Sequence, residues 1–162
     1  MNPPFTLNDL CEDLSTPSTE VLRDVELYAA QKPLTASEKE RLLGIILPLL
    51  KDFTPVASVL EATVPLIDQE TQTTVFESPL LDAVATHFRF CTDVCCRVFC
   101  ALSVANLVTP DLYTELLSYL PEVSIVPPSL DFFLTGVFNV LQTFPALPTP
   151  PLAIPENPAP PT

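Results

Sequence analysis

Apolar residues recur along this chain at spacings of three and four, which is the period of one face of an α-helix. Alternating apolar and polar residues are nearly absent, and so are the Gly and Asn-Gly turns that bound β-strands. The pattern predicts an all-α protein, a single bundle of about six to seven helices. We find no internal repeat in the sequence.

Helix starts are marked by Ser and Thr caps and by prolines. Ser18 or Thr19 can cap a helix that runs to Gln31, and Thr35 with Glu38 has the spacing of a capping box. Further helices are expected over residues 38–50, 55–67, 78–108, 111–120 and 130–144, with a loop at 68–74. The prolines at or after the ends of these segments limit their lengths.

The longest expected helix, 78–108, is apolar over most of its circumference and is predicted to be the central helix of the bundle. Its polar residues form one stripe, in which Arg89, Asp93 and Arg97 follow one another at spacings of four. Residues four apart are neighbours on a helix. Ion pairs Arg89–Asp93 and Asp93–Arg97 are therefore expected.

The chain divides into three parts on this pattern. Residues 1–16 form a short acidic amphipathic arm, residues 17–144 the helical domain, and residues 145–162 a tail in which eight positions are proline. Proline lacks the backbone N–H that a helix needs and favours polyproline II geometry. We therefore predict that the tail is disordered.

The charge balance limits the kinds of partner that the protein is expected to bind. Seven Lys and Arg against 20 Asp and Glu give a net charge of -13 over 162 residues. Nucleic-acid binding depends on cations that replace the counterions of phosphate, so nucleic acid is not expected as a partner. A partner protein with a basic surface is the expected complement.

Five cysteines and a residue bias bear on the context. The cysteines are odd in number and four of them fall between residues 91 and 100, which does not fit the spread, even set of a secreted disulfide framework. The N-terminus also lacks a basic and apolar leader. We expect an intracellular protein, cytoplasmic with a nuclear location left open.

The chain has twenty prolines, two glycines and no Trp. This bias suggests a reading frame that overlaps another gene, as in compact viral genomes, although an orphan cellular gene can have the same composition.

The residues that could carry chemistry are few. His87, Cys91 and Cys95 lie at spacings of four, so on a continuous helix they share one stripe and are the candidate metal ligands. Zinc needs four ligands, usually from two elements, and here only Cys11 could join them. Buried cysteines commonly serve as small apolar residues. We therefore expect core packing, no cofactor and no enzymatic activity.

Two apolar segments support alternative functions. Residues 42–50 are apolar nearly all round and could form the seam of a self-assembling structural protein. The helix over 130–144 could lie on a membrane surface, but its densely apolar part, 132–147, is shorter than the ~20 residues of a spanning helix. No stable membrane span is expected.

The first helical segment carries Leu7, Leu10 and Leu14 on one side, with Asp9, Glu12 and Asp13 around them. It resembles the acidic amphipathic segment with which adenovirus and papillomavirus transforming proteins bind retinoblastoma-type pocket proteins. The companion Leu-x-Cys-x-Glu motif and the paired Cys-x-x-Cys zinc module of those families are missing here. The resemblance implies that the three leucines are partner-binding anchors.

These observations together predict a non-enzymatic protein–protein interaction module. The expected biological context is a viral accessory protein that binds and modulates a host regulatory protein. In such a module a few apolar anchors supply affinity, and the acidic surface selects a basic partner.

Overall fold

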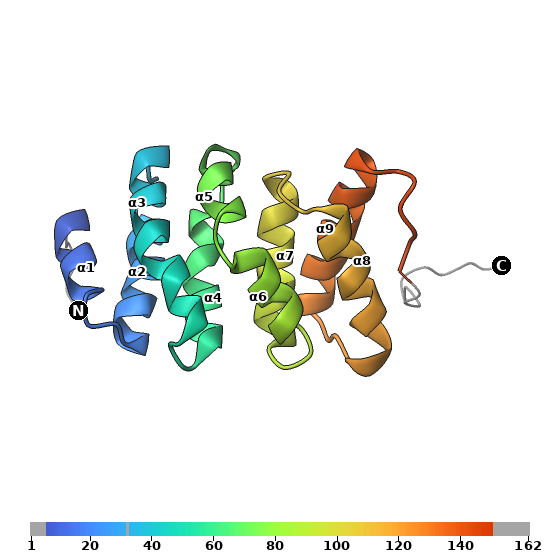
Figure 1. Ribbon diagram of the computed structural model, residues 1–162, viewed down its shortest axis with the longest axis horizontal. Helices are drawn as coiled ribbons and strands as arrows, with labels where there is room; N and C mark the ends of the chain where they lie inside the picture. The colour runs from blue at the N-terminus through green and yellow to red at the C-terminus, as the bar shows by residue number, and fades with distance from the viewer. Residues whose placement is uncertain (1–5, 32, 151–162) are drawn as a thin grey trace.

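The computed structural model describes residues 6–31 and 33–150, and every regular element within them is helical (Figure 1). The all-α prediction is confirmed. The α-helices are α1 (Leu7–Asp13), α2 (Thr19–Gln31), α3 (Ala36–Ile46), α4 (Val56–Thr63), α5 (Gln72–Phe76), α6 (Leu80–His87), α7 (Thr92–Val104), α8 (Pro110–Tyr119) and α9 (Ser129–Thr143). Short 3-10 turns extend or join them as η1 (Leu47–Lys51), η2 (Val64–Leu66), η3 (Gln69–Thr71) and η4 (Leu120–Glu122).

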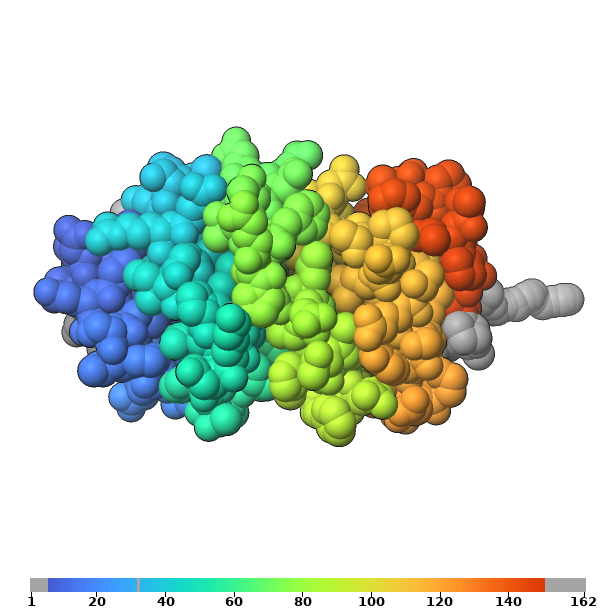
Figure 2. Space-filling model, in the orientation of Figure 1, coloured from blue at the N-terminus to red at the C-terminus, as the bar shows by residue number. Residues whose placement is uncertain are grey.

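The helices form an elongated array of two layers, where a bundle around one long central helix was expected. In one layer α2 contacts α4, α4 contacts α7, and α7 contacts α9. In the other, α3 contacts α5, α5 contacts α6, and α6 contacts α8. The chain alternates between the layers, so that α2, α4, α7 and α9 run in one direction (Figure 1). The space-filling view shows successive segments following one another along the long axis (Figure 2).

The layer of α2, α4, α7 and α9 has a regular spacing that the sequence did not reveal. These helices begin at residues 19, 56, 92 and 129, so successive starts are separated by 37, 36 and 37 residues. Contacts between neighbouring helices keep this spacing: Arg97 pairs with Glu61, and Ser129 bonds Asp93. Stacked helix pairs of this kind build α-solenoids, in which each pair contacts mainly its neighbours. The repeat lies in the packing and leaves no repeated motif in the sequence.

The prediction of one continuous helix over 78–108 is wrong, because the helix is interrupted by a turn at residues 88–91. The backbone N–H groups of Phe90 and Cys91 both bond the carbonyl of His87, and Cys91 has φ −124° and ψ 53°. The hydroxyl of Thr92 donates to the carbonyl of Phe88 at 2.7 Å, which competes with helical bonding. Phe88 is fully buried against Phe133, with ring centroids 6.0 Å apart. Tertiary packing thus overrides the helical pattern.

The break also changes the ion pairs. Arg89 bonds Glu122 at 3.1 Å and Arg97 bonds Glu61 at 2.7 Å, while the carboxylate of Asp93 accepts from the hydroxyl of Ser129 at 2.9 Å. The expected pairs of Arg89 and Arg97 with Asp93 are therefore replaced by contacts between helices. The bonds of Arg97 to Glu61 and of Ser129 to Asp93 tie α7 to α4 and α9, and the Arg89–Glu122 pair ties the turn at 88–91 to η4.

The core is densest where α7 meets α9. The rings of Phe99 and Phe133 lie 5.3 Å apart, and both side chains are fully buried. Gly136 of α9 faces Phe99 so closely that a Cβ built on it would lie 2.4 Å from a ring carbon. A glycine at this position lets the two helices approach each other.

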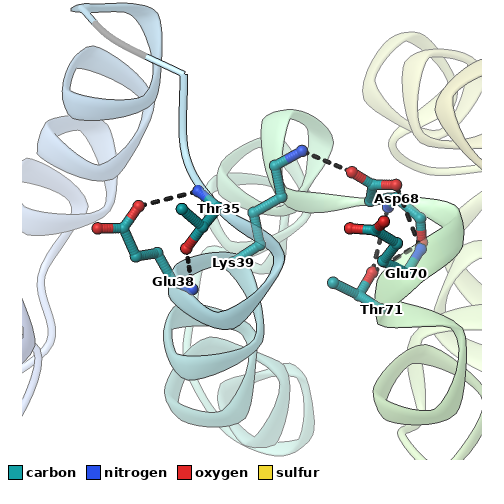
Figure 3. Close-up of polar contacts among 6 residues, drawn as sticks. All are labelled: Thr35, Glu38, Lys39, Asp68, Glu70 and Thr71. Atoms are coloured by element: carbon teal, nitrogen blue, oxygen red, sulfur yellow. Dashed lines mark hydrogen bonds and ion pairs between the residues drawn. The ribbon is translucent and has the colours of Figure 1, made fainter.

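The capping predictions hold at two helix starts, since the Ser18 hydroxyl oxygen also accepts a bond from the N–H of Val21 at the start of α2. Thr35 and Glu38 form the expected capping box at the start of α3, as Figure 3 shows. Beside it, the Lys39 ammonium lies 2.7 Å from the Asp68 carboxylate, which also caps η3 (Figure 3). Hydrogen bonding from Lys39 lowers the pKa of Asp68, and the backbone N–H of Glu70 acts in the same direction. This pair links α3 to the segment that leads into α5.

The sequence predicted a disordered tail that starts at Pro145, but the first residues of this segment pack against the helical body. Leu147 packs against the core, and its N–H bonds the carbonyl of Phe144 at 3.1 Å. The buried Tyr113 donates its hydroxyl proton to the carbonyl of Pro148 at 2.6 Å. Residues up to 150 are therefore part of the folded body, and the rest of the predicted tail, 151–162, lies outside the described residues.

Candidate interaction surface

Of the three leucines predicted as partner anchors, Leu7 and Leu10 lie in α1 and Leu14 is its C-cap residue. Helix α1 packs against α2 and α3. Leu10 and Leu14 are 0% and 2% exposed, and Leu7 is partly buried against the same core. Thr6 and Asp9 cap this helix reciprocally. The segment is thus the first helix of the body, and a partner could reach Leu10 and Leu14 only by separating α1 from it.

The break between α6 and α7 also separates the predicted metal ligands. His87 ends α6, Cys91 lies in the turn, and Cys95 is fully buried within α7, so the three side chains do not form one helical stripe. Within residues 6–31 and 33–150 no group of three or more His, Cys, Asp or Glu side chains is placed to hold a metal ion.

All five cysteines are free thiols. Burial raises the pKa of Cys95, as do the neighbouring Cys91 and Cys96. Burial also raises the pKa of Cys96, to about 12, with a contribution from the carboxylate of Asp93. Since the thiolate is the nucleophilic form, these environments oppose cysteine catalysis.

The apolar segment considered as a self-assembly seam is used by the protein's own core. Leu42, Leu43 and Ile46 are fully buried, and Leu47 and Leu50 are nearly so. Most of the apolar side chains of residues 42–50 therefore pack within the chain, while Ile45 and Leu49 are half-buried. As for a membrane span, none of the helices described in the structure is long and apolar enough to cross a bilayer.

Two grooves lie on the α2–α4–α7 layer, one on each side of α4. The first has a volume of about 380 Å³ and lies between α2 and α4. Its lining residues are mostly polar: Thr19, Glu20, Leu22, Arg23, Glu26, Ser58 and Glu61. Three carboxylates thus face one guanidinium in this groove, which gives it a negative charge.

The second groove has a volume of about 330 Å³ and lies between α4 and the start of α7. It is lined by Ala57, Glu61, Phe90, Cys91, Thr92, Asp93, Val94 and Arg97. Glu61 belongs to both grooves, where it bonds Arg97 at 2.7 Å. The two grooves therefore form one surface, which we call the α4 surface.

The α4 surface carries more acidic than basic side chains. Burial raises the pKa of Glu26, and the carboxylate of Glu61 raises it further, while Arg97 and Arg23 oppose the shift. Because Arg97 is bonded to Glu61, its charge is already shared. A cation brought by a ligand would relieve the repulsion between Glu26 and Glu61.

An exposed aromatic residue lies at the edge of the second groove. Phe90 is 77% exposed, the highest fraction among the large apolar side chains of the described residues. The adjacent Arg89 holds the turn in place, because its guanidinium lies 4.4 Å from the centre of the Tyr119 ring and bonds Glu122. The turn thus presents Phe90 to solvent from an anchored backbone.

Comparison of the chain with models of protein families, with curated proteins and with solved structures finds no match. The geometry described above therefore carries the functional argument.

Sequence reasoning missed the α4 surface because its residues come from three separate segments. Glu26, Glu61 and Arg97 are separated by 35 and 36 residues, and nothing within one segment marks them as neighbours. The only signal was the recurrence of helix starts at that interval, and it becomes visible once the boundaries of α4 and α7 are known.

Proposed function

We propose that this protein is a non-enzymatic interaction module that binds a basic, partly apolar segment of a partner protein on the α4 surface. The observation that carries the proposal is two adjacent grooves that share Glu61 and carry excess negative charge, beside a solvent-exposed phenylalanine. Short-range charge complementarity selects partners, and an aromatic anchor adds affinity.

Each half of the surface suits a different part of such a segment. A Lys or Arg side chain would enter the first groove between Glu20, Glu26 and Glu61, where its charge offsets the carboxylates. An apolar side chain would pack against Phe90, Ala57 and Val94 in the second groove. Stacked helices commonly use extended surfaces of this type to hold peptides.

The state of the thiols supports a binding role over a catalytic one. Cys95 and Cys96 are buried and their raised pKa values keep them protonated. They pack in the core between α7 and its neighbours, as small apolar residues do. The viral context and the intracellular location remain predictions from composition.

Selection of random displayed peptides against the folded protein tests the proposal, with affinities then measured on the synthetic peptides. We expect the selected peptides to combine Lys or Arg with an aromatic or aliphatic residue. The double variant Glu20→Lys/Glu26→Lys should weaken their binding by roughly tenfold or more, because each reversed contact at a partly exposed site is worth up to about 1 kcal/mol.

The matched control is Glu40→Lys/Glu70→Lys, which changes net charge equally but at exposed residues outside both grooves. It should bind the selected peptides like the unsubstituted protein at the same ionic strength. Phe90→Ser should also reduce affinity. Acidic or neutral selected peptides, or equal losses in the two double variants, would refute the proposal.

A further inference from the structure

A third groove lies where α3 and η1 meet the junction between α5 and α6, in the layer that does not carry the α4 surface. It has a volume of about 260 Å³. The buried side chains of Leu43 and Leu47 form its floor, with Gly44 and Pro48 on one wall and Pro79 on the other. We call it the Gly44 groove. None of its lining residues belongs to the α4 surface.

Gly44 leaves its backbone open to this groove. Glycine in a helix interior lowers stability relative to alanine. The other glycine of the chain, Gly136, lies against the Phe99 ring, where a Cβ does not fit. At Gly44 a Cβ would meet no atom within 4 Å. The protein's own packing therefore does not require glycine here, and the missing side chain gives a ligand close access to the backbone.

The carbonyl of Gly44 also lacks its helical hydrogen-bond donor. In an α-helix that donor is the N–H four residues later, but position 48 is proline, which has no N–H. The N–H of Leu47 does not replace it, because it bonds the carbonyl of Leu43. Helical carbonyls point towards the C-terminal end of the helix, so this oxygen is directed towards Pro48, along the wall of the groove.

Two other helices show how the chain otherwise meets this need. In α4 and α8, as in α3, a proline follows the C-cap residue. At the end of α4 the N–H of Val64 bonds the carbonyl of Glu61, which Pro65 leaves without a donor. At the end of α8 the N–H of Leu120 bonds the carbonyl of Leu117 in the same way. Of these three helices, α3 is the one that leaves such a carbonyl for a donor from outside.

The charges around the Gly44 groove are balanced. Lys51 lies on the α3–η1 wall and Glu77 on the opposite wall, and both side chains are exposed. Neither forms an ion pair with a residue that the structure describes. One charge of each sign favours an uncharged ligand, whereas the excess carboxylates of the α4 surface favour a basic one. The Lys51 ammonium can donate to a carbonyl of that ligand.

We propose that the Gly44 groove binds an extended, uncharged segment of a partner protein. One apolar side chain of the segment packs on Leu43 and Leu47, a backbone N–H donates to the Gly44 carbonyl, and a backbone carbonyl accepts from Lys51. An extended segment offers both backbone groups, whereas a helix uses them internally. The groove is smaller than the roughly 300–1,000 Å³ of small-molecule pockets, so it suits a single side chain. The proposal does not depend on the function assigned to the α4 surface.

NMR titration of the full chain with the capped peptide Ac-Ser-Thr-Leu-Thr-Ser-NH2 tests the proposal. The peptide is uncharged, and its Thr residues favour an extended backbone. We expect shifts of the backbone amides of residues 43–51 and 74–79, with a dissociation constant in the roughly millimolar range for so small a contact. Replacement of the central Leu of the peptide by Ala should weaken binding by roughly tenfold or more, because the apolar contact is lost.

Two variants of the protein test the role of the backbone. Gly44→Ala places a Cβ in the path of the peptide and should weaken binding about fivefold. Pro48→Ala restores an N–H for the Gly44 carbonyl and should also weaken binding about fivefold, the size of one hydrogen bond. The matched control is Pro121→Ala, because the carbonyl opposite that proline already has its donor, and it should bind the peptide normally.

The outcomes separate this site from the α4 surface and from other occupants. The double variant Glu20→Lys/Glu26→Lys should bind the peptide like the unsubstituted protein. Absence of shifts at residues 43–51 and 74–79, or unchanged affinity in both Gly44→Ala and Pro48→Ala, overturns the proposal. If deletion of residues 151–162 shifts the same amides without peptide, the chain itself occupies the groove, and the proposal of a partner segment is also overturned.

Discussion

Replacing each of the two glycines by alanine should change the stability of this protein in opposite directions. Both residues lie inside helices, where alanine is favoured over glycine by about 1 kcal/mol. At Gly44 in α3 a Cβ would have no atom within 4 Å. We therefore expect Gly44→Ala to raise the free energy of unfolding by about 1 kcal/mol and the melting temperature by about 2–4 °C.

Gly136→Ala should instead destabilise the protein. Its Cβ would lie 2.4 Å and 2.6 Å from two ring carbons of Phe99, which is fully buried and packed against Phe133. Relief of this overlap requires the buried Phe99 ring to shift or α9 to move away from α7. Overpacking of a core costs about 1–3 kcal/mol, and an overlap of this size belongs at the upper end. After the helix-propensity gain, the expected net loss is about 2 kcal/mol.

Urea unfolding followed by circular dichroism measures both variants under the same conditions. The two alanine variants should differ by about 3 kcal/mol in unfolding free energy, with unchanged dependence on urea. In a Phe99→Leu background the penalty of Gly136→Ala should shrink, because the clashing ring is gone, and the difference gives a coupling energy of about 1–3 kcal/mol. If Gly136→Ala is as stable as Gly44→Ala, the close approach of α7 and α9 is wrong.

Three other outcomes follow from the polar and thiol groups. The pKa of Glu26 is raised in the folded state, so between the ordinary carboxyl pKa and this raised pKa the folded chain binds more protons than the unfolded one, and it loses stability as pH rises through that range. Glu26→Gln should therefore stabilise the protein against urea at neutral pH but not below the ordinary carboxyl pKa, and Glu20→Gln is the control. The pKa of Asp68 is lowered in the folded state, so the stability that its carboxylate contributes is present at neutral pH and is lost as pH falls through this lowered pKa. Asp68→Ala should lower the free energy of unfolding by about 1 kcal/mol at neutral pH, measured by urea unfolding, and a loss of the same size in acid would show that the ionised carboxylate is not its source. Iodoacetamide followed by peptide mass spectrometry should label the partly exposed Cys11 in the native protein and leave Cys95 and Cys96 unmodified until urea is added, whereas rapid native labelling of either would show that their burial is wrong.

The parts of the fold that could be predicted from the sequence are those decided within a few residues. The capping box of Thr35 and Glu38 and the Thr109 cap of α8 join groups three residues apart, so their geometry follows from local chemistry. Proline limits the helices in the same local way. Apolar periodicity also follows the buried side of α2, where Leu22, Val25 and Tyr28, spaced three residues apart, lie in the core.

The interruption of the predicted 78–108 helix shows where local reasoning fails. Its pattern is compatible with one helix, but Phe88 packs with Phe133 and Arg89 reaches Glu122, and both partners are more than 30 residues away. The metal stripe of His87, Cys91 and Cys95 depended on the uninterrupted helix. The burial of Leu10 and Leu14 could not be foreseen for a related reason, since an apolar row on a helix looks the same whether it meets a partner or the protein's own core.

The sequence alone determined the helical class, the position of several helix starts and the excess of negative charge. The tertiary structure decided which apolar rows are covered and which carboxylates lie together. Glu26, Glu61 and Arg97 meet because α2, α4 and α7 stack side by side with starts 36 to 37 residues apart. Contacts over such separations depend on the packing of whole helices and on the turns between them, whereas a sequence pattern records only neighbours within a few residues.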